Sequence, residues 1–318
     1  MIRHYSKDNK LKTNDEYSSS RMGIAQELAF CWAAPMLPKS KSQDNMIRWI
    51  LTLLSILFIT VSTGFVNAPP AIAQEPPSTY TETELQEGDE LAAKAFTATN
   101  AGDFVTAEGL WTQLIERFPT NPAIWSNRGN SKVSQNKLSD AIADFNKSIE
   151  LAPNATDPYL NRGTALEGQG KYLEAIADYN RVLEIDPKDA MAYNNRGNAK
   201  AGLGEWEEAI ADYKKAADLA PNFAFARANY AIALYQMGEQ KEAIRTMKNI
   251  VRKYPQFPDM RAALTAALWE QGNRGEAESN WVAVVGIDRR YKDINWVKNV
   301  RRWPPVMVAA LEKFLSLQ

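Results

Sequence analysis

Cysteine and histidine are almost absent from this chain. The only cysteine, Cys31, and the only histidine, His4, both lie before residue 45. The rest of the chain therefore has no thiol or imidazole, which excludes disulfide bonds, zinc sites built on these ligands and any nucleophile–imidazole pair there. We expect neither a metal ion nor an organic cofactor.

An excess of charge of either sign is also missing. The 318-residue chain has a formal net charge of −1, whereas a nucleic-acid-binding protein normally has a clear basic excess. Hydrophobic residues make up 45% of the sequence, which is enough to bury a sizeable core. The composition thus fits a folded protein and gives no case for nucleic acid as a partner.

One long apolar run lies near the N-terminus. Residues 49–61 are almost entirely apolar, they follow Met46 and Arg48, and a small-x-small pattern comes soon after, at residues 71–73. This order is typical of a secretory signal peptide. We therefore predict a signal over residues 46–73, with cleavage after its last alanine.

A membrane anchor is the alternative interpretation of the same segment. Residues 49–66 give a stretch of about 18 residues, the short limit for a helix that spans a bilayer. Lysine and arginine lie only on its N-terminal side, at Lys39, Lys41 and Arg48, so the positive-inside rule places the rest of the chain outside the cytoplasm. Both interpretations predict export, and the second one also predicts membrane association through residues 49–66.

Two other N-terminal segments have no pattern of a folded element. Residues 1–45 do not fit a signal, so we expect a mis-assigned or disordered extension, with translation beginning at Met46. Residues 74–87 are rich in proline, threonine and glutamate, which predicts a flexible linker.

A period of 34 residues begins at Gly88 and repeats six times in register. Every copy has alanine at its twentieth place and an aromatic residue or methionine at its twenty-fourth, and proline closes the first five copies. Such a period indicates one helical hairpin copied along a solenoid. Proline ends the second helix because it cannot continue the hydrogen-bond ladder. The predicted copies are residues 88–121, 122–155, 156–189, 190–223, 224–257 and 258–291.

Glycine occupies two special places in this period. At the eighth place, Gly129, Gly163 and Gly197 are predicted to let the two helices of a hairpin approach closely. A second glycine, between the two helices, is predicted to supply a left-handed turn. This turn residue is found in five copies, as Gly102, Gly170, Gly204, Gly238 and Gly272.

These residues and their spacing resemble the tetratricopeptide repeat, over residues 88–291. The resemblance implies an all-α, right-handed α–α superhelix whose concave face is lined by the first helix of each copy. It also implies that a peptide or protein binds in that groove. One departure is the seventh place, usually leucine, which is arginine in the three central copies.

Arginine at the seventh place occurs together with aspartate at the twenty-third place. Helix geometry sets these two places opposite each other within one hairpin, which predicts structural ion pairs. A catalytic role would need a third group to activate a substrate, and none recurs nearby. The predicted pairs are Arg128 with Asp144, Arg162 with Asp178, and Arg196 with Asp212.

Asparagine is frequent on the face that the resemblance directs into the groove. Asparagine forms helices poorly, so its concentration on one face needs a reason. Each amide offers a donor and an acceptor, which suits clamping the backbone of an extended peptide. The pattern resembles the asparagine ladder of the O-linked N-acetylglucosamine transferase; the alternative is that these are solvated polar positions. The predicted ladder is Asn127, Asn130, Asn161, Asn194, Asn195, Asn198 and Asn229.

Toward the C-terminal copies the predicted groove becomes apolar. Phe225, Ile232, Tyr235 and Trp269 occupy places that face inward, and aromatic residues are favoured anchors at interfaces. We expect a partner segment over copies two to five, with a large side chain inserted near Trp269. The alternative is that Tyr235 and Trp269 only cover the core.

The carboxylate clamp of heat-shock co-chaperones is missing from this groove. That clamp needs lysine or arginine at the second and fifth places of particular copies, where this chain has Ser126, Leu160, Met191 and Asn194. Recognition of an acidic C-terminus by that route is therefore disfavoured.

Residues 292–318 follow the last copy, and we predict a C-terminal capping segment that ends in an amphipathic helix. A solenoid end exposes an apolar face, so a cap is expected; a dedicated docking helix is the alternative. The basic residues between Arg289 and Arg302 are interpreted as a solvated face, with contact to anionic lipid or an acidic partner as the alternative.

The predicted function is that of a non-catalytic adaptor or assembly factor, a monomer or weak oligomer whose partner is another protein. The signal, the repeats and the tail resemble tetratricopeptide proteins of cyanobacteria and chloroplast thylakoids, some of which assist photosystem assembly. That resemblance implies a periplasm or a thylakoid lumen. The alternatives are a structural envelope scaffold without a specific client and a hydrolase that uses only carboxylates.

Overall fold

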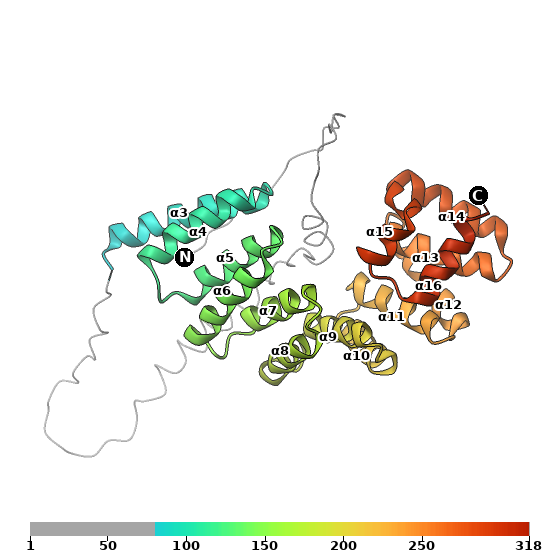
Figure 1. Ribbon diagram of the computed structural model, residues 1–318, viewed down its shortest axis with the longest axis horizontal. Helices are drawn as coiled ribbons and strands as arrows, with labels where there is room; N and C mark the ends of the chain where they lie inside the picture. Colours follow the sequence, from blue (N-terminus) through green and yellow to red (C-terminus); the bar gives the residue numbers. More distant parts are fainter. Residues whose placement is uncertain (1–79, 318) are drawn as a thin grey trace, which may run out of the picture.

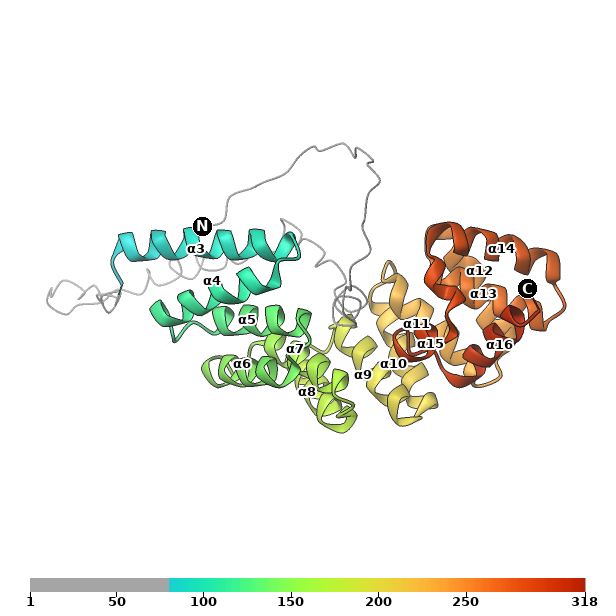
Figure 2. The same ribbon diagram turned by 45° about the horizontal axis from the view of Figure 1, so that its top comes forward.

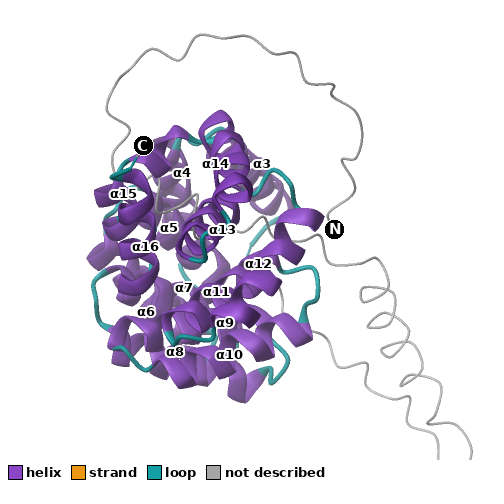
Figure 3. Ribbon diagram, turned by 90° about the vertical axis from the view of Figure 1, so that its right-hand side faces the viewer, coloured by secondary structure: helices purple, strands orange, loops and turns teal. Residues whose placement is uncertain are grey.

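The computed structural model describes residues 80–317, and in them the chain forms only helices and connecting loops (Figure 3). The predictions for residues 1–45 and 46–73 lie outside this range. Within residues 80–317, no helix has both the length and the apolar character needed to cross a bilayer.

Consecutive helices pair into hairpins, two helices for each predicted copy (Figure 1). The most extensive contacts lie inside each hairpin, and the second helix of each hairpin also packs on the first helix of the next. From copy two onward, the first helix of each hairpin begins at the first residue of its copy. The helices are α3 (Glu82–Asn100), α4 (Phe104–Arg117), α5 (Pro122–Ser134), α6 (Leu138–Leu151), α7 (Thr156–Gly168), α8 (Tyr172–Ile185), α9 (Ala190–Leu203), α10 (Trp206–Leu219), α11 (Ala224–Gln236), α12 (Gln240–Lys253), α13 (Pro258–Glu270) and α14 (Arg274–Ile287).

The first helix starts earlier than the repeat period predicts. Helix α3 begins at Glu82, so residues 82–87 are helical and the predicted linker over residues 74–87 is wrong in that part. A capping box is the cause: the backbone N–H of Glu84 donates to the Thr81 hydroxyl, and the Thr81 N–H donates to the Glu84 carboxylate at 2.8 Å.

The turn inside each hairpin needs a left-handed residue. All five glycines predicted for this place have positive φ, between 75° and 83°. Copy two has no glycine there, and Asn136 takes the same conformation with φ of 60°. Asparagine tolerates this region better than most residues, so the hairpin geometry is kept.

Close approach of the two helices depends on the glycine at the eighth place. A Cβ atom added to Gly163 would lie 2.6 Å from the ring of Tyr179 on the second helix. The same conflict arises at Gly129 against Phe145 and at Gly197 against Tyr213. A larger residue would therefore push the first helix, and the concave face that it builds, away from the second.

The C-terminal segment folds back onto the repeats instead of extending the stack (Figure 2). It consists of the 3₁₀ helix η1 (Arg289–Lys292), α15 (Ile294–Asn299) and α16 (Pro305–Leu315). Helix η1 contacts α14, while α16 packs on α13 and α11, the first helices of copies six and five. The predicted C-terminal helix is thus present, and it covers the concave side of the last two copies.

Candidate protein-binding groove

Ion pairs join the two helices of each central hairpin. In copy three, Arg162 donates from Nε and Nη2 to the two carboxylate oxygens of Asp178, at 2.8 and 2.6 Å. These hydrogen bonds raise the pKa of Arg162, and they fix the first helix against the second. The same two-bond geometry joins Arg128 to Asp144 and Arg196 to Asp212.

Each of these arginines also lies over an aromatic ring from the preceding turn. The guanidinium carbon of Arg162 is 5.6 Å from the ring centre of Tyr159, a cation–π contact. Trp125 and Tyr193 are placed in the same way against the arginines of copies two and four. Sequence reasoning missed this contact, although an aromatic residue at the fourth place of the same three copies was the available signal.

The predicted asparagine ladder divides into two parts. In copies two and three, Asn127, Asn130 and Asn161 lie on α5 and α7 and are partly exposed. Their side-chain amides take part in none of the hydrogen bonds found among residues 80–317. Donor and acceptor of each amide are therefore open to a ligand.

In copies four and five the ladder residues bind one another. Asn194 donates to Asn195 Oδ1 at 3.1 Å, and Asn229 donates to Asn194 Oδ1 and Asn198 Oδ1 at 3.0 and 3.1 Å. The hydroxyl of Tyr213 also donates to Asn198 Oδ1, at 2.9 Å. The amide oxygens are thus used within the cluster, and the NH₂ groups of Asn195 and Asn198 have no hydrogen-bond partner among the described residues.

The apolar end of the predicted groove is covered by the chain itself. Ile232 and Tyr235 are buried, and the ring of Trp269 meets Phe314 of α16 edge-on at 5.2 Å between centres. Tyr235 donates to Glu270 at 2.6 Å. The expectation of an open aromatic anchor at Tyr235 and Trp269 is therefore corrected: an apolar concave face needs a cover, and the amphipathic α16 supplies it.

A short link between α15 and α16, residues 300–304, faces first-helix residues of copies four and five across a cavity, and we call it the C-terminal strap. It is held by the buried carboxylate of Asp259 on α13. Asp259 accepts hydrogen bonds from Tyr291 at 2.7 Å, Arg301 at 2.9 Å and Trp303 at 3.0 Å. Sequence reasoning missed this centre; an aspartate at a groove-facing second place was the only signal.

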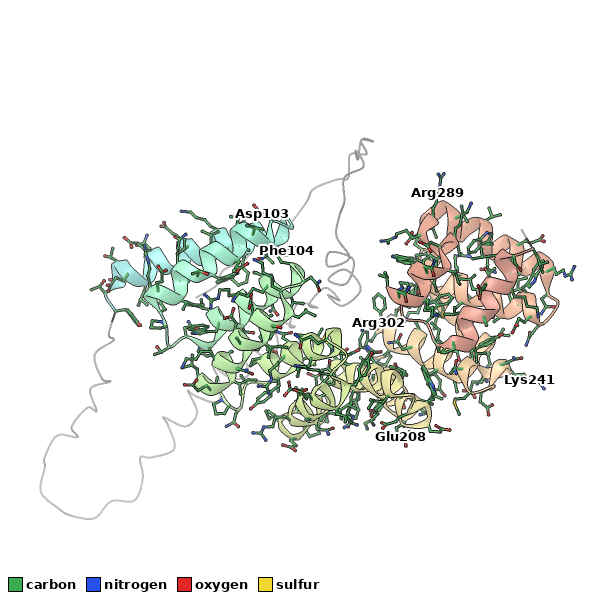
Figure 4. All side chains as sticks on the ribbon, in the orientation of Figure 1. Asp103, Phe104, Glu208, Lys241, Arg289 and Arg302 are labelled. Carbon is green, nitrogen blue, oxygen red and sulfur yellow. The ribbon has the colours of Figure 1, made fainter. Side chains whose placement is uncertain are left out.

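The strap and the concave face of copies three to five line a partly open cavity of about 210 Å³. Figure 4 labels Arg302 on the strap, between the central repeats and the C-terminal helices. Phe225, predicted for the groove, packs edge-on against Phe257 at 5.3 Å and also lines this cavity. Further lining residues are Glu167, Asn194, Asn195, Asn198, Asn229 and Tyr213.

Glu167 lies on α7, the first helix of copy three. Its side chain is buried and lines the cavity. Burial raises the pKa of its carboxyl from the usual 4.5 to about 8. The hydrogen bond from the Tyr179 hydroxyl, at 3.0 Å, and the positive charge of Arg302 oppose that rise. At neutral pH the group is therefore an uncharged acid.

Comparison with known proteins identifies the repeat. Family models described as TPR repeat match residues 129–170 and 168–204, and models described as tetratricopeptide repeat match residues 190–223 and 229–256. The chain contains tetratricopeptide repeats.

Solved structures share the tetratricopeptide fold of this chain. A tetratricopeptide repeat protein of Parabacteroides merdae is 20% identical, with a TM-score of 0.52 over 73% of this chain and 100% of its own. A thermophilic TPR protein of Thermus thermophilus is 19% identical, with a TM-score of 0.50 over 57% of this chain and 99% of its own. The predicted all-α superhelix of stacked hairpins is confirmed.

Among curated proteins, Hsp70-Hsp90 organizing protein 2 of Arabidopsis thaliana is 38% identical over 66 residues. The match covers 21% of this chain and 12% of the Arabidopsis protein. A Protein SGT1 homolog of rice is 36% identical over 70 residues, which are 22% of this chain and 19% of that protein. This chain thus spans only a small part of the length of either relative.

Proposed function

We propose that this protein is a non-catalytic adaptor that binds an extended segment of a partner protein along the concave face of copies two to four. The observation that carries the proposal is the set of open amides at Asn127, Asn130 and Asn161, on the first helices of neighbouring hairpins. An extended backbone has unpaired N–H and C=O groups along its length, which such amides satisfy without reading side chains. Tetratricopeptide repeats are in general protein-binding modules, which supports the same function.

The open groove is shorter than the sequence predicted. Helix α16 covers α11 and α13, so the surface of copies five and six is filled by the chain itself. We therefore place the partner segment on copies two to four, between the first hairpin and the C-terminal strap.

Site-specific photocrosslinking tests this proposal. We expect a benzoylphenylalanine residue in place of Asn130, in the groove, to capture a partner that the same residue in place of Asn100, at the exposed end of α3, does not. Replacing Asn127 and Asn161 with alanine should reduce the capture from position 130, while Asn299→Ala, at an exposed position on α15, should not. Equal capture from positions 100 and 130, or capture unaffected by Asn127→Ala and Asn161→Ala, would contradict groove binding.

We also propose that the repeats lie on the non-cytoplasmic side of a membrane and serve the assembly of a photosynthetic complex. The support is the signal-like order of residues 46–73 and the resemblance to thylakoid tetratricopeptide proteins. Residues 1–79 fused to alkaline phosphatase, which is active only after export, should give an active enzyme. Inactive phosphatase would contradict the export proposal. A captured partner that is unrelated to photosynthesis would contradict the assembly role.

A further inference from the structure

The groove of copies two to four is closed at its C-terminal end. Beyond copy four, a bound segment meets the C-terminal strap, and behind the strap α16 fills the concave face. Met307, Leu311 and Phe314 of α16 are fully buried in the core cluster formed with α11 to α14. The backbone N–H of Val306 also donates to Gln236 on α11, at 3.0 Å. An extended chain therefore cannot continue along copies five and six.

The cavity at this closed end presents hydrogen-bond donors. The amide oxygens of Asn194, Asn195 and Asn198 accept bonds within the asparagine cluster. The NH₂ groups of Asn195 and Asn198 remain open, and among the described residues the guanidinium of Arg302 has no hydrogen bond or ion pair. Such a site has hydrogen-bond donors without a partner, while its acceptors are already bonded. It therefore favours a ligand group that accepts hydrogen bonds and donates none.

The charged residues that line the cavity are Arg301, Arg302, Asp259 and Glu167. Arg301 is neutralised by Asp259, with Nη2 and Oδ2 at 2.9 Å, and Glu167 is uncharged at neutral pH because burial raises its pKa to about 8. The guanidinium of Arg302 then faces a protonated carboxyl group and has no ion-paired carboxylate among the described residues. Basic side chains also outnumber acidic ones from copy five to the C-terminus, whereas the reverse holds in residues 80–223, so a negative group is favoured at this end.

The backbone of Arg302 is held in a costly conformation. Its φ of 54° lies in the left-handed region, which residues other than glycine rarely adopt. Its neighbours Arg301 and Trp303 are both bound to Asp259, so the strap is anchored on each side of Arg302. This anchoring fixes the position of the Arg302 backbone beside the cavity.

We propose that the cavity beneath the C-terminal strap binds the free C-terminal carboxylate of the partner segment, with Arg302 as its cationic contact and the amides of Asn195 and Asn198 as further donors. A chain end fits because the strap leaves a continuing chain no path. The inference rests on the proposed function, which places an extended segment in this groove. It uses none of the second- and fifth-place positions of the co-chaperone clamp.

Peptide selection on the full chain tests the inference. Random dodecapeptides displayed with a free C-terminus are selected, and each selected peptide is synthesised as the free acid, as the C-terminal amide, and as a free acid with its internal Asp and Glu changed to Asn and Gln. We expect the free acids, with or without internal acidic residues, to bind at least tenfold more tightly than the amides. Arg302→Gln should remove most of that ratio by weakening the free acid alone. Arg302→Lys should keep part of it, and Lys298→Gln, at an exposed basic position of α15, should leave it unchanged.

Each result decides between the two claims. The carboxylate site is overturned if the free acid and the amide bind with equal affinity, or if Arg302→Gln weakens both equally. Groove binding still stands in that case if Asn127→Ala and Asn161→Ala reduce the affinity. Loss of affinity only when internal acidic residues are removed assigns the contact to a side chain and also overturns the proposal. If no displayed peptide binds, or binding ignores the groove variants, the proposed function fails as well.

Discussion

Glu167 stands out among the single residues because its carboxyl group is almost inaccessible to water. It lies where copies three and four line the cavity, and Tyr179 and Tyr213 face it from the second helices. Both tyrosines have a pKa raised by burial and by Glu167 itself. The local environment therefore favours an uncharged acid over a carboxylate.

A pH-dependent stability follows from this environment. Between the usual pKa of 4.5 and the folded value of about 8, the unfolded chain has lost a proton that the folded chain keeps. The free energy of unfolding should therefore fall as pH rises across this window, by roughly 1.4 kcal/mol per pH unit. Glu167→Gln removes that contribution, so thermal unfolding followed by circular dichroism should show the variant gaining stability over wild type from pH 5 to pH 8. Parallel pH profiles of the two proteins would rule this out.

The paired Arg162 and Asp178 give a second residue-scale prediction. Asp178→Ala should lower the free energy of unfolding by up to about 3–5 kcal/mol, because a half-buried guanidinium loses its partner. The matched control is Glu184→Ala on the same helix, which breaks the exposed pair with Arg181 at 2.9 Å and should leave the free energy of unfolding nearly unchanged because water screens that pair. An unchanged melting temperature in Asp178→Ala would show that the pair does not stabilise the fold.

At the scale of elements, the C-terminal strap depends on one carboxylate. Asp259 is the common acceptor for a phenol, an indole and a guanidinium that come from three points of the segment after α14. Satisfying two buried donors and one partly buried donor with one group makes the docking of α15 and α16 sensitive to that group.

Asp259→Ala should therefore loosen the strap. We expect amide hydrogen exchange in residues 300–317 to become faster, because Tyr291, Arg301 and Trp303 lose their shared acceptor, while exchange in α5 to α8 stays as in wild type. Glu278→Ala, at an exposed position of α14, serves as the control. Exchange that is unchanged in the strap would show that apolar packing of α16 alone holds the segment.

At the scale of the whole molecule, the core is unevenly distributed. The largest apolar cluster joins α11 to α14 with α15 and α16, whereas copies two to four contain smaller separate clusters. Repeat arrays contact mainly their neighbours, so their parts can open independently. Native-state hydrogen exchange should find the strongest protection in α13 and α16 and weaker protection in α5 to α8. Uniform protection from α5 to α16 would contradict a divided core.

The repeats could be predicted from the sequence because each hairpin carries its own local determinants. Gly163, Tyr179, the left-handed turn glycine and the arginine–aspartate pair all act within one hairpin, so spacing alone places them. The docking of α16 could not be predicted in the same way. The apolar face of α16 indicated that this helix packs on the repeats. Whether it packs on α14 or on the concave face depends on contacts between residues far apart in the sequence, such as Phe314 with Trp269.

The hydrogen bonds among the groove residues could not be predicted from the sequence either. Sequence placed the ladder asparagines on one face, yet it could not indicate that Asn194, Asn195, Asn198 and Asn229 bind one another. Such bonds depend on the distance between α9 and α11, which the curvature of the stack sets. The burial of Glu167 and the role of Asp259 depend equally on three-dimensional neighbours.

The closed end of the groove is built by the last two hairpins together with the strap and α16, while its length is set by the hairpins before. In the proposed binding mode, duplicating or deleting one internal repeat would change how many residues of the partner segment are bound, without altering how its terminal carboxylate is recognised. The proposed groove would thus select partner segments by length from a fixed end: in related chains, the number of internal hairpins should vary together with the length of the segment that they bind.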